Sequence, residues 1–282
     1  MTAEQTPVPV LDPGDPMIAR IGADSSSRVL GVRYRGRTAA GAAVCEQQIT
    51  AARLDRHGFI GIDSLGVLID VAGGAPTYGL ISADAENVVA RLSVSLTPAV
   101  AGPATVLVAG ETLTVDSVRG NALAAGKIFA GGAVIGSVTC RTMAVTRSAV
   151  APPVAGQAVA VDDALDNGLA ATAPAADGTA LATRWRPQPW MDNGIGSVQG
   201  GVILGCAAAV ADQAAAQASP LRRQVIDLSL EIMRSPTLSE TGYRWVSTVL
   251  RSGRRLAVVD SVLVDDDGHR YAQSTATAMT LN

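Results

Sequence analysis

Two stretches of this sequence carry residues whose types and spacing could do chemistry at a carbonyl group. The first holds Asp70, a carboxylate set among apolar neighbours. A carboxylate can activate a water molecule or attack a carbonyl carbon directly. The second holds Asn193 and the pair Gly200 and Gly201, where an apolar run begins. If that run is a helix, its first backbone N–H groups can hold the negative charge that develops on a carbonyl oxygen.

The two stretches occupy matched places in a duplicated sequence. Residues 55–58 lie 138 positions before residues 193–196, and Pro98 lies 138 positions before Pro236, with no gap between. Near the ends, residues 142–145 match residues 278–281 at a shift of 136. Two copies of roughly 120 residues indicate a duplicated domain whose halves pack on each other. Because the polar residues at matched positions differ, each copy holds the half of a site that the other lacks.

The elements that must position these residues have the same order in both copies. Val- and Thr-rich segments separated by glycine-containing turns predict strands. In the first copy we expect strands at 29–34, 43–49, 88–96, 104–108, 112–118, 123–129 and 134–145, and a helix over about 64–80. In the second copy we expect strands at 169–172, 180–185, 224–233, 243–252, 254–264 and 271–281, and a helix over about 200–218. Because residues 201–211 are apolar on every face, a sheet must wrap that helix.

The domain organisation follows from these elements. Residues 1–27 are predicted to be a flexible N-terminal tail. An N-terminal unit spans 28–146, a Pro- and Ala-rich linker spans 147–161, and a C-terminal unit spans 162–282. The fold class is therefore α+β, with two antiparallel sheets that each wrap one central helix.

Composition excludes several classes of function. The 282 residues are 48% hydrophobic, which is enough for a sizeable core, and the net charge of -3 does not favour a nucleic acid as partner. Three widely spaced cysteines (Cys45, Cys140 and Cys206) argue against a disulfide framework and a zinc site. The N-terminus lacks the features of a signal peptide, and no apolar run is long enough to cross a membrane. We therefore expect a cytoplasmic protein.

The segment from Asn193 to Gly205 resembles the signature of the hotdog-fold acyl-CoA thioesterases of the phenylacetate-pathway type. Their pattern is Asn-x-x-Gly-x-x-His-Gly-Gly, followed by an apolar helix with an Asp eight residues after the first glycine of the pair. Asn193, Gly196, Gly200 and Gly201 match this pattern. The departures are Gln199, in place of the usual His, and Ala208, in place of the catalytic Asp.

The first copy shows the complementary pattern. Asp55 stands in the Asn position, Gly58 matches, and Gly61–Asp63 replaces His-Gly-Gly, whereas Asp70 falls where the family has its carboxylate. Eight residues of helix span about 12 Å, so a carboxylate cannot reach a carbonyl held at the start of its own helix. It must serve the start of an antiparallel partner helix, as the resemblance also implies. We therefore predict one complete site, from Asp70 with the second copy's motif, and one inactive counterpart.

The resemblance implies a tandem double hotdog that hydrolyses acyl-CoA thioesters. Asp70 would act as base or nucleophile, and the N–H of Gly200, with that of Gly201, would hold the oxyanion. Asn193 would hold the loop or orient water, and Gln199 could donate a hydrogen bond or cap the helix but could not transfer protons. No metal or redox cofactor is implied, since coenzyme A is part of the substrate. The alternatives are a non-catalytic acyl-CoA binding or regulatory protein, and a hotdog enoyl-CoA hydratase or dehydratase.

Other candidate residues have weaker support. A basic hairpin turn is a candidate for the phosphates of coenzyme A; it holds Arg251, Arg254 and Arg255, and Arg53 and Arg56 are similar candidates. His57 is interpreted as a loop residue and His269 as a surface residue. Trp185, Trp190 and Met191 are expected either in the core or along an acyl pocket. The Val-rich sheet faces would allow homo-oligomers of the double unit.

Overall fold

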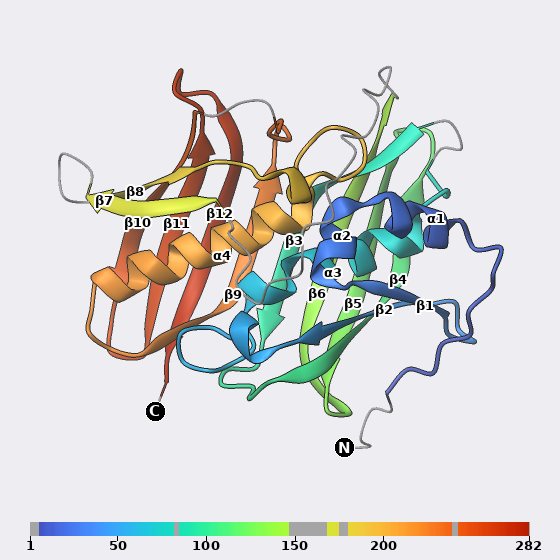
Figure 1. Ribbon diagram of the computed structural model, residues 1–282, viewed down its shortest axis with the longest axis horizontal. Coiled ribbons are helices and arrows are strands. Elements are labelled where there is room, and N and C mark those ends of the chain that lie inside the picture. The colour runs from blue at the N-terminus through green and yellow to red at the C-terminus, as the bar shows by residue number, and fades with distance from the viewer. Residues whose placement is uncertain (1–5, 82–84, 147–167, 175–179, 239–241, 282) are drawn as a thin grey trace.

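Twelve antiparallel strands form one continuous sheet (Figure 1). The structure is a computed structural model that describes residues 6–81, 85–146, 168–174, 180–238 and 242–281. The strand order is β1-β2-β4-β5-β6-β3-β9-β12-β11-β10-β8-β7. In the first unit the elements are β1 (Arg33–Arg37), β2 (Ala43–Ile49), α3 (Ile62–Gly74), β3 (Ala85–Leu96), β4 (Ala104–Asp116), β5 (Asn121–Ala130) and β6 (Ala133–Thr146). In the second unit they are β7 (Leu169–Pro174), β8 (Ala180–Trp185), α4 (Gly200–Gln217), β9 (Arg223–Ile232), β10 (Tyr243–Ser252), β11 (Leu256–Val264) and β12 (Arg270–Thr280).

The two units are related by an approximate two-fold axis at the centre of this sheet. The strand order of the second half mirrors that of the first, and the units join where β3 pairs with β9. At that junction Leu92 pairs with Leu230, which lies 138 positions later in the sequence. Helices α3 and α4 also begin 138 positions apart, so the structure confirms the predicted duplication.

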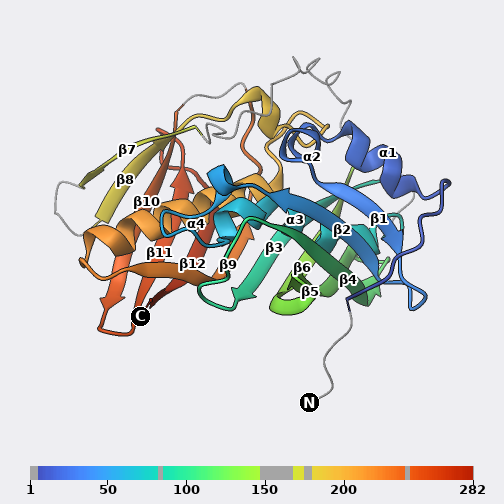
Figure 2. The same cartoon turned by 60° about the horizontal axis from the view of Figure 1, so that its bottom comes forward.

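Helices α3 and α4 lie side by side on one face of the sheet, which curves around them (Figure 2). Over residues 200–211, helix α4 is apolar all round, which fits its position with the sheet on one side and α3 on another. Its side chains at Val202, Leu204 and Ala207 are buried, as are Leu65 and Leu68 of α3. This arrangement of two helices wrapped by a twelve-stranded sheet is the double hotdog that the sequence predicts.

Strand β4 is longer than the sequence analysis expected. The prediction placed two strands, 104–108 and 112–118, on either side of a turn, but the backbone continues as one strand to Asp116. A bulge between Thr112 and Thr114 absorbs the irregularity, and β5 pairs along the whole length. The glycine that suggested a turn, Gly110, is there because a Cβ atom would overlap the Ala72 carbonyl oxygen of α3. The prediction was wrong because this glycine allows close helix–strand approach.

The N-terminal segment is helical where a loose tail was expected. Helix α1 spans Pro16–Ala23 and α2 spans Ser25–Leu30, so the predicted strand at 29–34 is reduced to β1. Asp15 accepts a hydrogen bond from the Met17 N–H and caps α1, while proline occupies the first helical position. Gly31, in the left-handed conformation with φ 70°, ends α2. The predicted linker at 147–161 lies outside the described residues.

The remaining predictions about the core concern cysteines and apolar helices. Cys45, Cys140 and Cys206 are free and buried, in agreement with a role as small apolar side chains. In the part of the chain that the structure describes, no helix has the length and apolarity that crossing a membrane requires. Trp185, Trp190 and Met191 are buried, and the cavity described below is lined by other residues.

Candidate active site

Glycines at the crossing of α3 and α4 bring the two helices into backbone contact. A Cβ atom at Gly66 would overlap the carbonyl oxygen of Gly201, and one at Gly201 would overlap the carbonyl oxygen of Gly66. A Cβ atom at Gly205 would lie 2.8 Å from the Asp63 carbonyl oxygen. The helices run antiparallel, so the start of α4 lies beside the second half of α3. The glycines therefore place Asp70 next to the first residues of α4.

Asp70 contacts the start of α4 directly. The Gly201 N–H donates a hydrogen bond of 2.8 Å to Asp70 Oδ2, across a sequence separation of 131 residues. The Asp70 side chain is buried, with 7% of the residue exposed. A Cβ atom at Gly200 would lie 3.1 Å from the same oxygen, so a larger residue there would crowd the carboxylate. The structure thus brings together Asp70, Gly200 and Gly201 from the two units.

The pKa of the Asp70 carboxyl lies near neutral pH. Burial raises the pKa of this carboxyl to about 7, and the Gly201 N–H opposes that rise by stabilising the charged form. The nearby Asp24 carboxylate raises the pKa further, whereas the Arg20 guanidinium lowers it. A carboxyl with a pKa close to the working pH can both accept and return a proton, which is what general acid–base chemistry requires.

Asn193 uses its side chain to shape the loop before α4. Its Oδ1 accepts hydrogen bonds from the Ile195 N–H at 3.0 Å and the Ser197 N–H at 3.4 Å, and its Nδ2 donates to Ser197 Oγ at 2.8 Å. The matched residue of the first unit, Asp55, accepts from the N–H groups of the residues two and four positions later, at 2.8 and 2.9 Å. An Asn or Asp at this position therefore serves the turn in both units.

Gln199 caps α4 and also lines the cavity described below. Its Oε1 accepts a hydrogen bond of 3.2 Å from the Val202 N–H, so the side chain satisfies one of the open groups at the helix start. Its Nε2 has no hydrogen-bond partner among the described residues, and Gln199 lines the cavity beside Asp70. The Gly200 N–H likewise has no acceptor in the described part of the chain. The site therefore offers two donors to a bound molecule.

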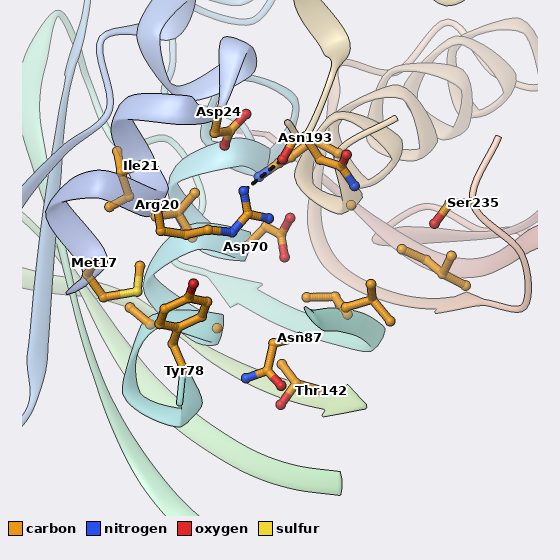
Figure 3. A pocket seen from close by; sticks show the side chains of 18 of the residues that line it. Met17, Arg20, Ile21, Asp24, Asp70, Tyr78, Asn87, Thr142, Asn193 and Ser235 are labelled. Atoms are coloured by element: carbon orange, nitrogen blue, oxygen red, sulfur yellow. Dashed lines mark hydrogen bonds between the residues drawn. The ribbon is translucent and has the colours of Figure 1, made fainter. Parts of the chain in front are cut away.

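A cavity of ≈ 90 Å³ is lined by Asp70, Asn193, Gln199 and Gly200 (Figure 3). Both units and the N-terminal helices line it. Several of its polar lining residues had no signal in the sequence; they are Arg20, Asp24, Tyr78, Asn87, Thr142 and Ser235. Arg20 donates a hydrogen bond of 2.8 Å to the carbonyl oxygen of Asn193, and its guanidinium lies between Asp24 and Asp70 (Figure 3).

The matched region at the start of α3 holds polar contacts between the two units. Ala208 is buried and offers no carboxylate. The Gln224 amide donates to Asp55 Oδ2 at 2.9 Å and to the Ile60 carbonyl oxygen at 3.2 Å. Arg56 pairs with Asp212 of α4 at 3.1 Å. These contacts bridge the two units where the first site has its cavity.

The other candidates lie away from Asp70. Arg223 donates hydrogen bonds to the Ala215 and Gly253 carbonyl oxygens, so the turn that holds Arg251, Arg254 and Arg255 lies beside the C-terminal end of α4. Ala215 is about 22 Å along the helix from Gly200. The structure therefore does not bring these three arginines to the cavity.

The remaining sequence candidates also have positions outside the site. Arg53 donates to the Leu30 carbonyl oxygen and so holds α2 in place. His57 lies in a loop, with Nε2 2.9 Å from the Arg223 carbonyl oxygen. His269 is exposed beside Asp265 in the β11–β12 turn.

Comparison with known proteins identifies the fold. No family model and no curated protein matches this sequence. Among solved structures, a tesB protein of Mycobacterium avium subspecies paratuberculosis has a TM-score of 0.67 at 10% identity and covers 94% of this chain and 100% of its own. A putative oleoyl thioesterase from Lactobacillus plantarum has a TM-score of 0.61 at 12% identity, with 86% and 97% covered. A hot dog fold protein of unknown function from Alicyclobacillus acidocaldarius has a TM-score of 0.61 at 11% identity, with 92% and 98% covered.

These likenesses extend over nearly the whole length of the chain and of each similar protein. They agree with the strand order and the paired helices described above, so this chain has the double hotdog fold. The phenylacetate-pathway subtype stays a prediction from the sequence signature.

Proposed function

We propose that this protein hydrolyses acyl-CoA thioesters at a single composite site between its two hotdog units. The observation that carries the proposal is the hydrogen bond of 2.8 Å between Asp70 Oδ2 of the first unit and the Gly201 N–H of the second. It fixes a buried carboxylate at the N-terminus of the partner helix, beside a cavity. The name of one structure with this fold, the putative oleoyl thioesterase from Lactobacillus plantarum, supports the same chemistry.

The contacts refine the roles that the sequence suggested. The Gly201 N–H donates to Asp70 and so orients the carboxylate. The Gly200 N–H is then the backbone donor that binds the oxyanion. The free Nε2 of Gln199 is a second donor for the thioester oxygen or for the attacking water. Ionised Asp70 then acts on the thioester carbonyl, either by activating water or as the nucleophile. Asn193 holds the loop in shape and does not touch the reacting atoms.

The first test is thiol release from a panel of acyl-CoAs by the wild type and by Asp70→Asn. Because an Asn side chain cannot take up the proton, we expect kcat to fall by at least about a hundredfold. The matched control is Asp267→Asn, in the exposed β11–β12 turn, which should retain wild-type kcat. Full activity of Asp70→Asn would contradict the proposed carboxylate.

The alternatives give different results in the same assay. A protein that binds S-alkyl-CoA thioethers but releases no thiol from any acyl-CoA would be an acyl-CoA binding protein. Conversion of an enoyl-CoA without thiol release would indicate a hydratase. For an active enzyme, one turnover in ¹⁸O-labelled water followed by mass spectrometry tests the nucleophilic role, because label in Asp70 requires a mixed anhydride that water opens at the Asp70 carboxyl carbon.

A further inference from the structure

The α1–α2 segment, residues 16–30, packs against the loop that leads into α4. Arg20 Nη1 donates to the Asn193 carbonyl oxygen at 2.8 Å, and Ser26 Oγ donates to the Trp190 carbonyl oxygen at 3.1 Å. Both acceptors belong to the second unit, whereas the segment itself leads into β1 of the first. The N-terminal helices therefore bridge the two units at the edge of the candidate site.

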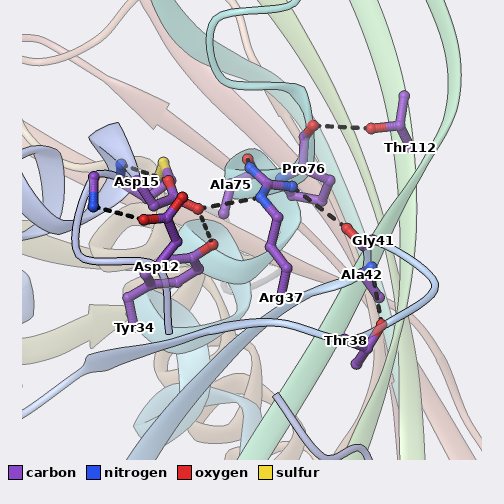
Figure 4. A network of polar contacts seen from close by, with 12 residues as sticks. Asp12, Asp15, Tyr34, Arg37, Thr38, Gly41, Ala42, Ala75, Pro76 and Thr112 are labelled. Carbon is purple, nitrogen blue, oxygen red and sulfur yellow. Dashed lines mark hydrogen bonds and ion pairs between the residues drawn. The ribbon is translucent and has the colours of Figure 1, made fainter. Parts of the chain in front are cut away.

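A polar network fixes the beginning of α1 (Figure 4). The Asp15 carboxylate accepts hydrogen bonds from the Tyr34 hydroxyl at 2.6 Å, from Arg37 Nε at 3.2 Å and from the Met17 N–H at 3.0 Å. Arg37 also reaches the Ala75 carbonyl oxygen at 3.5 Å. Helix α1 is thus tied to β1 and to the end of α3, so its position relative to Asp70 is set at both ends.

The inner face of α1 forms an apolar wall of the cavity. Met17 and Ile21 lie one helical turn apart, are 4% and 8% exposed, and line the same cavity as Asp70 (Figure 3). Ile18, the neighbour of Met17, is 39% exposed on another face of the helix. Of these three side chains, Met17 and Ile21 are therefore the ones that an acyl group in the cavity would meet.

The size of the cavity limits what fits beside Asp70. Its volume is ≈ 90 Å³. An apolar cavity of about 150 Å³ accepts one benzene ring, so by proportion this one accepts roughly four carbon atoms. A longer chain would have to displace the wall formed by α1 or extend out through the open mouth of the cavity, and the contacts of Asp15, Arg20 and Ser26 oppose that displacement.

We propose that the α1–α2 segment is the specificity element of this site, in which Met17 and Ile21 restrict the acyl group to short chains of about four carbons. The inference rests on the proposed acyl-CoA function for its choice of ligand. It concerns binding, however, and binding can be measured whether or not the bound thioester is hydrolysed.

The test is calorimetric titration of the full chain with S-alkyl-CoA thioethers that carry ethyl, butyl, hexyl and octyl groups. We expect the wild type to bind the butyl compound at least about tenfold more tightly than the octyl compound, since each misfitted methylene is worth about that factor. Met17→Ala removes most of the wall. We expect this variant to raise the ratio of the octyl association constant to the butyl association constant about tenfold. Ile21→Ala should shift the ratio in the same direction and serves as the second variant.

Ile18→Ala is the matched control, because it shortens an exposed side chain on the same helix and should leave the chain-length ratio unchanged. Wild-type preference for the octyl compound would overturn the inference. An unchanged ratio in folded Met17→Ala and Ile21→Ala would also overturn it. Selective binding without hydrolysis would support the specificity element and contradict the proposed hydrolysis, so the two failures are distinguishable.

Discussion

At the scale of single residues, the site depends on the charges around Asp70. Arg20 and Asp24 approach it from the N-terminal helices, Cys140 faces it from β6, and Tyr78 lines the same cavity from the end of α3. Among the described residues that line this cavity, Arg20 is the one cationic side chain. Its positive charge lowers the pKa of Asp70, which burial and the Asp24 carboxylate raise.

Removal of this charge should change the pH dependence of activity. In Arg20→Gln the pKa of Asp70 rises above about 7, so less of the carboxylate is ionised at neutral pH. We expect the acid limb of kcat/KM to move to higher pH, with low activity at pH 7 that recovers as the pH is raised. The measurement is the pH–rate profile, and Arg20→Lys should restore most of the wild-type midpoint.

Arg28→Gln provides the control for this profile. Arg28 is exposed on α2 and donates to the Ser25 hydroxyl, away from the cavity. Its replacement should leave the midpoint unchanged. If Arg20→Gln lost activity equally at every pH, the arginine would serve only to hold the loop through Asn193, and its electrostatic role would be refuted.

At the scale of elements, the close crossing of α3 and α4 decides whether the site exists. Gly66 and Gly201 are in mutual backbone contact, and no side chain fits between them. Separation of the helices would stretch the hydrogen bond between Asp70 and Gly201. The same glycines therefore contribute both to the stability of the core and to the geometry of the carboxylate.

Gly66→Ala should destabilise the protein, because its Cβ would overlap the Gly201 carbonyl oxygen and approach the Gly205 nitrogen at 2.9 Å. Overpacking of this kind costs about 1–3 kcal/mol. Urea unfolding measures the loss. Gly74→Ala, on the same helix with open space around its Cβ position, should keep or raise stability because alanine favours a helix. Equal stability of Gly66→Ala and the wild type would show that the helices do not cross this closely.

At the scale of the whole molecule, the duplication gives two matched regions whose side chains make different contacts. Asp70 and the start of α4 line a cavity, whereas at the matched position Gln224 and the pair of Arg56 and Asp212 form polar contacts between the units. One site for two units is therefore the expected stoichiometry.

This asymmetry predicts that a carboxylate alone cannot rebuild the second site. Ala208→Asp places an Asp at the position that matches Asp70, but Gln224 holds the loop before α3 there, and Ile62 and Asp63 stand at the positions of the glycine pair. In an Asp70→Asn background we expect Ala208→Asp to restore no thiol release. Titration with S-butyl-CoA should still show one site per chain. Recovery of activity in the double variant would show that the second region is open to substrate.

The sequence by itself determined the duplication, the two central helices and the pairing of Asp70 with the glycines of the other copy. These follow from local periodicity and from the length of a helix, which places Asp70 too far from the start of its own helix. Asp15 and Pro16, followed by Met17 and Ile21 at helical spacing, also indicated α1, although the prediction treated them as a tail.

Only the tertiary structure decided how the groups of the site share their hydrogen bonds. That the Gly201 N–H binds Asp70 is a contact across 131 residues, and the contact of Arg20 with Asn193 spans 173. Likewise, Arg254 lies near the C-terminal end of α4, because the turn between the paired strands β10 and β11 is held there by Arg223. Local sequence patterns set the type of each element, but long-range packing sets which side chains meet, because that depends on the crossing of elements distant in the chain.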